Sequence, residues 1–160
     1  MSRMRCGVAA VEALRAAGVT KVFGLMGSST LEIYDALYDA RDMEYIGVRH
    51  ENCGMHMADA WGRVTQTPGL FMCGQAGPGS ANMVLGLAQA KMAYSPAVVI
   101  TGLPSTEHMG RDAFQEIDYP RMFGGIAKWV AEVTAPERIA ETMLRALRVA
   151  TTGVPGPVVI

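Results

Sequence analysis

The sequence lacks the features that would place the protein in several specialised classes. Its three cysteines, Cys6, Cys53 and Cys73, stand far apart and form no C-x-x-C pair, so we expect a reducing cytoplasm and no disulfide framework. None of its apolar runs approaches the length of a membrane span, and charged residues interrupt the first one too early for a signal peptide. A formal net charge of −1 gives no electrostatic basis for binding nucleic acid or an anionic membrane.

The hydrophobic content and the apolar pattern of the sequence fit one globular domain. Half of the 160 residues are hydrophobic, which is enough for one substantial core but not for two. Short apolar runs alternate with helical patterns, and the runs are continuously apolar, as in a parallel sheet that is buried on both faces. We therefore expect a doubly wound α/β fold of about six parallel strands with helices on both faces. Ligands of such folds bind beyond the carboxyl ends of the strands.

The expected elements follow the apolar pattern. The strands are expected at 21–25, 44–48, 69–73, 97–101, 128–133 and from 155 onward. Three helices are expected: one that ends near Gly18, one that follows the second strand and runs through Trp61, and one that follows the third strand and runs through Lys91. A long polar loop is expected over 102–118. Two further helices are expected to begin at capping pairs, Ser29 with Glu32 and Thr134 with Glu137.

The segment "HENCGMH" contains two histidines and a glutamate but does not match a zinc motif. H-E-x-x-H needs its second histidine one helical turn after the first, and that position is Gly54 here. His50 and His56 are separated by about 600° of helical rotation, so they point to different faces. We therefore expect a helix-start histidine and a surface histidine, and no metal site in this chain.

Other candidate sites have an ordinary structural explanation beside a functional one. The glycines of "GQAGPG" have neither the dinucleotide nor the P-loop spacing, so their spacing favours tight turns, with Pro78 at a helix start and Gly77 allowing close backbone approach. Cys53 is interpreted as a small buried hydrophobic residue rather than a nucleophile. Asp112 and Glu116 belong to a solvated loop, although long loops at the ligand edge often carry function.

Glu51 is a carboxylate at a junction of otherwise apolar and small residues. It is either a first-turn glutamate that interacts with the helix dipole, or a carboxylate held in an apolar cleft to move one proton. The second role needs burial to raise its pKa against the effect of the helix N-terminus. The residues alone leave both interpretations open.

Six ordered segments resemble the N-terminal pyrimidine-binding domain of thiamine diphosphate enzymes, and the acetolactate synthase-like group most closely. These segments are "VFGLMGS", "VRHENCGMHMADAWGR", "GQAGPGSAN", "AVVITG", "GRDAFQEID" and "TTGVPGPVVI". The resemblance extends over nearly the whole chain, so residues 1–160 are interpreted as one such domain. It implies a carboligase or decarboxylase that acts on 2-oxo acids or aldehydes.

The resemblance also implies roles for individual residues. A glutamate at the position of Glu51 hydrogen-bonds N1′ of the cofactor's aminopyrimidine and activates the cofactor for loss of its C2 proton. The other cofactor contacts implied are Gly27, Gln75, Pro78 and Asn82. Phe114 and Gln115 would reach the cofactor and the substrate from the long loop.

The chain also departs from the family pattern. Acetolactate synthases usually have Pro-Gly-Gly at Met26–Ser28 and Thr-Ser at Gln75–Ala76. The forms found here are more similar to sulfoacetaldehyde acetyltransferases. That similarity makes such a transferase an alternative to an acetolactate synthase.

Further parts of the enzyme are implied beyond this chain. Family members bind the diphosphate through Mg²⁺ in a domain marked by Gly-Asp-Gly, and nothing here matches it. The chain is therefore expected to be either a truncated product, which its end inside a strand favours, or a separate subunit, as in sulfopyruvate or phosphonopyruvate decarboxylases. Its expected partners are a diphosphate-binding domain or subunit and further copies in a dimer or tetramer. A non-catalytic binding or assembly domain is the alternative from another class.

Overall fold

The computed structural model describes residues 4–160, and its centre is one six-stranded sheet in which every neighbouring pair of strands is parallel. The strand order is β2-β1-β3-β4-β6-β5. The strands are β1 (Lys21–Leu25), β2 (Glu44–Gly47), β3 (Gly69–Cys73), β4 (Ala97–Thr101), β5 (Trp129–Val130) and β6 (Pro157–Val159). The doubly wound α/β prediction is confirmed.

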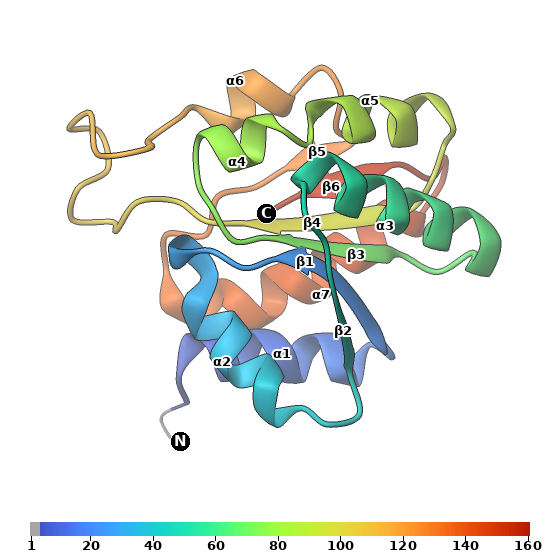
Figure 1. The fold of residues 1–160 in the computed structure, drawn as a ribbon, viewed down its shortest axis with the longest axis horizontal. Helices are drawn as coiled ribbons and strands as arrows, with labels where there is room; N and C mark the ends of the chain where they lie inside the picture. Colours follow the sequence, from blue (N-terminus) through green and yellow to red (C-terminus); the bar gives the residue numbers. More distant parts are fainter. Residues whose placement is uncertain (1–3) are drawn as a thin grey trace.

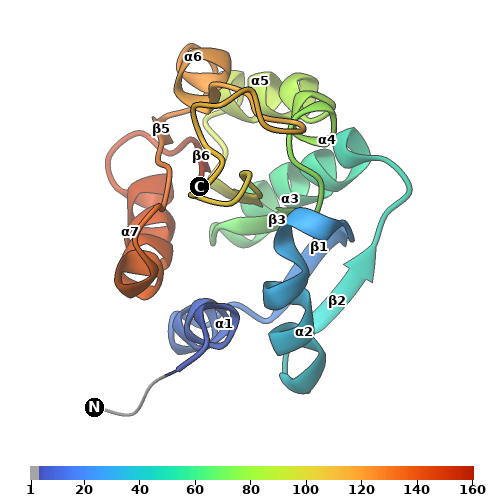
Figure 2. The ribbon, with the colours of Figure 1, turned by 90° about the vertical axis from the view of Figure 1, so that its left-hand side faces the viewer.

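Helices cover both faces of the sheet (Figures 1 and 2). The first layer contains α1 (Cys6–Ala16), α2 (Leu31–Asp39) and α7 (Ile139–Thr151). The second layer contains α3 (Glu51–Thr65), α4 (Pro78–Ala81), α5 (Val84–Met92) and α6 (Tyr119–Phe123). Two short 3₁₀ helices, η1 (Ser28–Thr30) and η2 (Pro136–Arg138), precede α2 and α7.

The central strands are apolar throughout because each of their faces packs against a helix layer. In β4, Val98 and Ile100 belong to the core on the α1, α2 and α7 side, whereas Ala97 and Val99 belong to the core on the α3 and α5 side. All five residues of β3 and of β4 are buried. The alternation of side chains across a strand therefore supplies both cores from one continuous apolar run.

Among residues 4–160, no helix has both the length and the apolar character that crossing a membrane would require.

Both capping predictions were wrong. Ser29 lies in η1, and its hydroxyl accepts a hydrogen bond from the N–H of Ala76 (3.2 Å) instead of capping α2. Pro136 begins the 3₁₀ turn η2, so α7 starts only at Ile139 and has no side-chain cap. In both places a 3₁₀ turn lies between the expected cap and the helix.

Several elements also differ from expectation. The fifth strand is reduced to Trp129–Val130, because β5 lies at the sheet edge with only one neighbouring strand. The helix expected through Lys91 is divided into α4 and α5 by a break at 82–83. The helix α6 was not predicted at all.

Candidate functional site

The candidate site lies at the carboxyl edge of the sheet, where the loops that follow β1 and β3 are joined by hydrogen bonds. The N–H of Gly74 donates to the carbonyl of Leu25 (2.8 Å), and the N–H of Ser29 donates to the carbonyl of Gly74 (3.0 Å). Because all strands are parallel, the loops after β2 and β4 end at this edge too. The residues predicted to act together therefore come from four successive strand ends.

Glu51 is the first residue of α3 and is only 8% exposed. The Nδ2 atom of Asn82 donates a hydrogen bond to Oε2 of Glu51 (2.9 Å). No second donor from residues 4–160 reaches this carboxylate. The result is a buried, oriented carboxylate with one oxygen available to a ligand.

His50 supports the start of the same helix. It is the N-cap of α3, and its Nδ1 accepts a hydrogen bond from the N–H of Asn52 (3.1 Å). The prediction of a helix-start histidine is confirmed. Within the described part of the chain, no three histidine, cysteine or acidic residues are grouped as a metal site would require.

The backbone of α4 passes close to Glu51. A Cβ atom placed on Gly79 would lie 3.1 Å from Oε1 of Glu51 and 2.8 Å from Cβ of Gln75. The same Cβ would lie 3.6 Å from the Sγ of Cys73. Burial raises the pKa of the Cys73 thiol, and the nearby Glu51 carboxylate raises it further. Glycine at position 79 thus leaves room for the carboxylate and for Gln75 side by side.

Gly27 is fixed against the loop that carries Gln75. A Cβ atom on Gly27 would lie 2.5 Å from the carbonyl carbon of Gly74, so only glycine allows this approach. The Oγ of Ser28 also donates to Oε1 of Gln75 (3.4 Å). Gly27 and Gln75, both predicted as cofactor contacts, therefore lie together.

Gln115 joins the same cluster from the loop after β4. The Nε2 of Gln75 donates to Oε1 of Gln115, and a Cβ atom on Gly77 would lie 2.8 Å from the Gln115 carbonyl oxygen. Gly77 and Gln115 both have positive φ, 57° and 63°. Phe114 is 86% exposed, so its side chain is not part of this packing. The structure thus brings Gln115 into the cluster but does not bring Phe114 into it.

Glu116 holds the loop in shape at the next position. Its carboxylate accepts hydrogen bonds from the N–H groups of Gly110 (2.6 Å) and Ala113 (2.9 Å). These bonds lower the pKa of Glu116 below its ordinary value. The acidic residue interpreted as part of a solvated loop is therefore also the anchor of that loop.

Sequence reasoning missed a buried hydroxyl network centred on Tyr119. The Tyr119 hydroxyl donates to the carbonyl of Gly102 (2.8 Å) and accepts from the N–H of Gly77 (3.1 Å). It also lies 2.8 Å from the Oγ of Ser80, which is 2.5 Å from the Oγ1 of Thr101. Asp118 followed by Pro120 is a helix-start pattern, and Asp118 indeed caps α6. That signal could have revealed the helix that supplies Tyr119.

Two other residues considered from the sequence, Pro78 and Cys53, are exposed. Pro78 begins α4 directly after Gly77, as predicted, and is exposed. Cys53 is exposed, so the prediction of a buried cysteine was wrong. Cys53 lies on the outer side of α3, because Met55 and Ala58 occupy the side of the helix that packs on the sheet.

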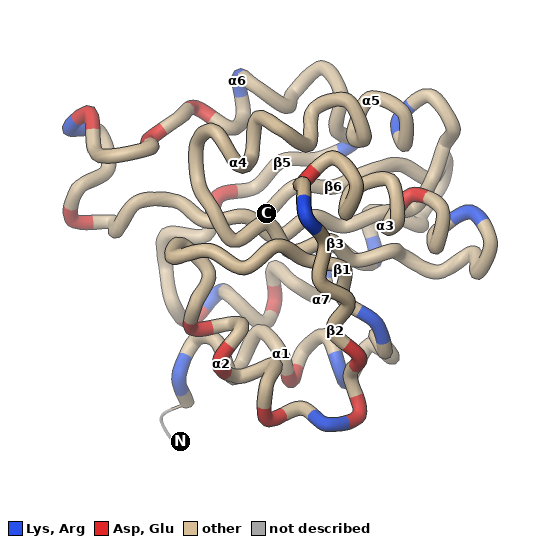
Figure 3. The backbone as a smooth tube through the Cα atoms, in the orientation of Figure 1, with Lys and Arg blue, Asp and Glu red and all other residues tan. Residues whose placement is uncertain are grey.

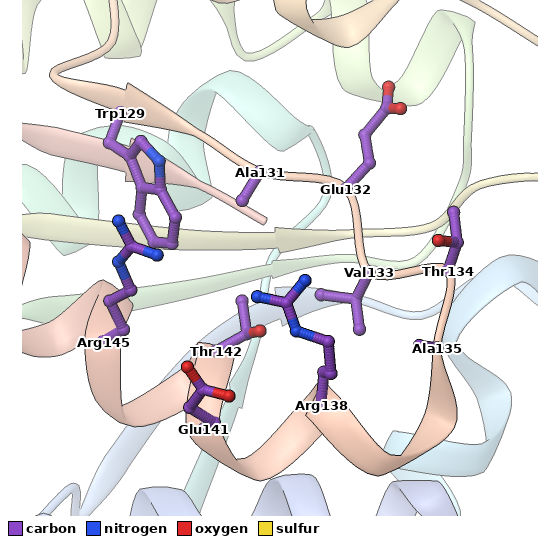
Figure 4. Close-up of a pocket in the computed structure, with 10 residues that line it drawn as sticks. All are labelled: Trp129, Ala131, Glu132, Val133, Thr134, Ala135, Arg138, Glu141, Thr142 and Arg145. Atoms are coloured by element: carbon purple, nitrogen blue, oxygen red, sulfur yellow. The ribbon is translucent and has the colours of Figure 1, made fainter.

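A separate cavity of about 220 Å³ lies between β5 and α7 (Figure 4). Two arginines and two glutamates line it, namely Arg138, Arg145, Glu132 and Glu141, so its formal charges cancel. The guanidinium of Arg145 lies 4.6 Å from the ring centroid of Trp129. None of the residues predicted to act together lines this cavity.

Sequence similarity to known proteins assigns the chain to a family. The family profile described as "Thiamine pyrophosphate enzyme, N-terminal TPP binding domain" matches residues 4–122. The chain is 42% identical over 155 residues to a probable acetolactate synthase large subunit of Methanocaldococcus jannaschii, a match that covers 97% of this chain and 26% of the relative. It is 41% identical over 155 residues to the acetolactate synthase large subunit of Parasynechococcus marenigrum, covering 95% of this chain and 25% of the relative.

A further relative is the acetolactate synthase isozyme 3 large subunit of Escherichia coli, 38% identical over 143 residues, which are 89% of this chain and 25% of the relative. The chain thus spans about a quarter of the length of the curated relatives it matches. The family match extends over the strands β1 to β4 and the loops that carry Gly27, Glu51, Gln75, Asn82 and Gln115. The chain therefore belongs to the thiamine pyrophosphate enzymes, and it is their N-terminal pyrimidine-binding domain of the acetolactate synthase-like type.

Proposed function

We propose that this domain is the pyrimidine-binding half of a thiamine diphosphate-dependent carboligase or decarboxylase acting on 2-oxo acids or aldehydes, similar to acetolactate synthase. The observation that carries the proposal is the buried carboxylate of Glu51, oriented by Asn82 at the carboxyl edge of the sheet. A helix-start glutamate that served only the helix dipole would not need burial or a side-chain partner.

The polar groups around Glu51 fit an aminopyrimidine ring. The edge of such a ring carries nitrogen atoms that accept a hydrogen bond and an amino group that donates one. Glu51 offers a carboxyl oxygen that no donor among residues 4–160 engages and that can share a proton with a ring nitrogen, and Gln75 and Gln115 add amide groups nearby. Glu51 and Asn82, with Gly27 and Gln75 beside them, are the residues that would hold the ring.

Each of these residues has a task that follows from its position. Glu51 holds the proton at N1′ of the pyrimidine, and its exclusion from water strengthens that hydrogen bond. Asn82 keeps the carboxylate turned toward the ring. Gly27, Gly77 and Gly79 let the backbone approach without a side chain in the way. Thiamine diphosphate, when bound, supplies a nucleophilic carbon that adds to a carbonyl group.

The remaining parts of the proposal concern the whole protein. Mg²⁺ and the diphosphate would be bound by a domain or subunit other than this one, and the active enzyme would be a homo-oligomer in the cytoplasm. Phe114, exposed beside Gln115, would contact the substrate from the loop. The length of the relatives, about four times that of this chain, supports additional domains.

A second candidate substrate is sulfoacetaldehyde. Ser28 and Gln75 supply polar side chains to the loops beside Gly27, where their Oγ and Oε1 atoms are 3.4 Å apart. Their presence favours a transferase that accepts a more polar aldehyde. Subunits of sulfopyruvate or phosphonopyruvate decarboxylases are a related alternative.

A chimaeric enzyme tests the proposal. This chain would replace the matching quarter of the M. jannaschii acetolactate synthase large subunit, with which it shares 42% identity. We expect thiamine-dependent consumption of pyruvate or of sulfoacetaldehyde, and loss of that activity in the Glu51→Gln chimaera. A folded chimaera that binds thiamine diphosphate but turns over neither substrate would favour a non-catalytic binding or assembly domain.

A further inference from the structure

The cavity between β5 and α7 combines two guanidinium groups with an aromatic ring. Arg138 is the last residue of η2, and Arg145 follows about two helical turns later in α7, so both lie on one side of the helix. Figure 4 shows both side chains extending from the helix toward the chain segment that begins at Trp129. The ring of Trp129, with its centroid 4.6 Å from the Arg145 guanidinium, holds that planar group in place.

Neither guanidinium has an acidic partner, since none of the ion pairs formed within residues 4–160 includes Arg138 or Arg145. Charged residues are dense along α1 and α2 of the same helix layer (Figure 3), and there Arg5 is paired with Asp35 (2.9 Å). The two arginines of the cavity therefore keep their donor groups available for a ligand.

Two carboxylates also line the cavity without neutralising these arginines. The side chain of Glu132 turns away from both guanidinium groups (Figure 4), and Glu141 forms no ion pair with either of them in the described chain. They still add negative charge to the walls. The cavity is thus better suited to a ligand with one negative charge than to a dianion.

A buried hydroxyl without a partner lies between the two arginines. Thr142 lines the cavity, is 7% exposed, and comes one helical turn after Arg138 and one before Arg145. The hydroxyl of Thr151 bonds to the carbonyl of Leu147 one turn earlier, whereas the Thr142 hydroxyl makes no hydrogen bond within residues 4–160. Since buried polar groups normally have a partner, this hydroxyl indicates a ligand with an oxygen acceptor.

The opposite wall supplies further donors. The N–H of Ala131 still donates to the carbonyl of Val159 (3.0 Å), but beyond it the chain leaves the sheet. The N–H groups of residues 132–134, which line the cavity, have no acceptor in the part of the chain that the structure describes. Backbone donors of this kind favour an anion.

The rest of the lining is apolar and the space is small. Trp129, Ala131, Val133 and Ala135 contribute apolar surface. The volume of about 220 Å³ equals that of about seven molecules of liquid water, which suits a ligand of about six non-hydrogen atoms.

We propose that this cavity is a binding site for a small monocarboxylate with a short apolar chain. The carboxylate accepts hydrogen bonds from the guanidinium of Arg138 and the hydroxyl of Thr142, and the apolar chain lies against Trp129 and Val133. The planar fork of an arginine matches the two oxygens of a carboxylate. None of the residues assigned to the pyrimidine lines this cavity, so the two sites are separate.

Titration of the chain with sodium isobutyrate, at an ionic strength held constant with sodium chloride, tests the proposal. The chain has two tryptophans, and Trp61→Phe assigns the indole N–H signal of Trp129 in NMR spectra. We expect that signal in the wild-type chain to shift and saturate, with half-saturation at roughly 1–10 mM for so small a ligand. Isobutyramide, which has the same shape but no charge, should bind at least about 10-fold more weakly.

Arg138→Gln should weaken isobutyrate binding by about 10-fold or more, and Thr142→Val by about 2- to 10-fold, because each removes one hydrogen-bond donor. Arg148→Gln removes an exposed arginine of the same helix outside the cavity and is the matched control, with unchanged binding expected. Circular dichroism shows whether each variant is folded. If Arg138→Gln does not fold, Thr142→Val decides.

The proposal is wrong if the Trp129 signal shows no saturable shift up to about 100 mM isobutyrate. It is also wrong if isobutyramide or inorganic phosphate binds as tightly as isobutyrate, or if the folded cavity variants bind as the control does. The test uses neither cofactor nor turnover. It can therefore succeed or fail independently of the chimaera experiment.

Discussion

At the scale of single residues, Asn82 is the side chain that orients the carboxylate of Glu51. We predict that Asn82→Ala lowers turnover of the chimaera by roughly 10- to 150-fold, because a hydrogen bond to a charged group contributes about 1.5–3 kcal/mol. The melting temperature should also fall, because the buried carboxylate of Glu51 loses this hydrogen-bond donor. Gln89→Ala removes an exposed amide elsewhere on α5 and serves as the control. Equal turnover in the two variants would rule out an orienting role for Asn82.

Gly27 supports a second prediction at this scale, one that concerns stability. Its backbone is extended, so Gly27→Ala introduces no backbone strain, but the new Cβ would overlap the carbonyl of Gly74. We expect a loss of about 1–3 kcal/mol in the free energy of unfolding, measured by urea denaturation. Gly125→Ala is the control, because a Cβ there meets no atom within 4 Å. A loss in Gly27→Ala no larger than in the control would contradict the close approach.

At the scale of elements, α6 is tied to the glycine turn by the hydroxyl of Tyr119. Tyr119→Phe leaves the N–H of Gly77 and the carbonyl of Gly102 without this partner. We predict a loss of about 1–3 kcal/mol in the free energy of unfolding, the typical cost of unsatisfied buried polar groups. Tyr38→Phe, at an exposed tyrosine of α2, should cost far less. Similar losses in both variants would show that the network contributes little.

The loop before α6 should respond to acid through Glu116. Its pKa is lowered by the N–H donors of Gly110 and Ala113, so the stabilisation is present at pH values above the ordinary glutamate pKa of about 4.3. It is lost as the pH falls through the lower pKa of the folded state. We predict that the amide proton shifts of Gly110 and Ala113, followed by NMR, titrate below pH 4.3.

The titration should disappear in Glu116→Gln and persist in Glu107→Gln, which alters an exposed glutamate of the same loop. Only pH values at which the far-ultraviolet circular dichroism is unchanged are compared, so that global unfolding does not interfere. Amide shifts that stay constant, or that titrate equally in Glu116→Gln, would contradict the anchoring role.

The main elements of the fold were predictable, because continuous apolar runs such as Ala97–Thr101 arise only where both faces of a strand are buried. The starts of α2 and α7 were not. Ser29 has the residue type of a cap, but its hydroxyl bonds to Ala76 in a loop 47 residues away in sequence. A local sequence pattern cannot show that a residue distant in the sequence will take the hydrogen bond that a cap would otherwise make.

The same limit applies to the site. Family resemblance predicted Glu51, Gly27, Gln75, Asn82 and Gln115 as site residues, and the structure places them near one another at the end of the sheet. The residues alone left Glu51 undecided between a helix-start charge and a held carboxylate. Its burial and its bond to Asn82 depend on how α3 and α4 pack, which no local pattern encodes.

At the level of the whole chain, the proposed pyrimidine site has no counterpart for a metal ion: among residues 4–160 no three histidine, cysteine or acidic residues form a cluster that could hold one. Since the diphosphate and its Mg²⁺ should supply most of the affinity, we predict that the isolated chain binds thiamine diphosphate weakly and shows no turnover. Isothermal calorimetry with and without Mg²⁺ measures this. Micromolar, Mg²⁺-dependent binding to the isolated chain would contradict the division of the site between two domains.

If Glu51 holds a proton at the cofactor pyrimidine, the rate at which bound thiamine diphosphate exchanges its C2 hydrogen in the chimaera depends on the Glu51 carboxyl group. Glu51→Gln keeps the shape of the side chain but cannot carry that proton. We predict C2 hydrogen–deuterium exchange, measured by NMR, that is slower by roughly 10²–10⁴-fold with little change in cofactor affinity. Glu32→Gln, which alters an exposed first-turn glutamate of α2, is the matched control and should exchange at the wild-type rate. Wild-type exchange in Glu51→Gln would show that Glu51 does not hold this proton and would leave it as a helix-start charge.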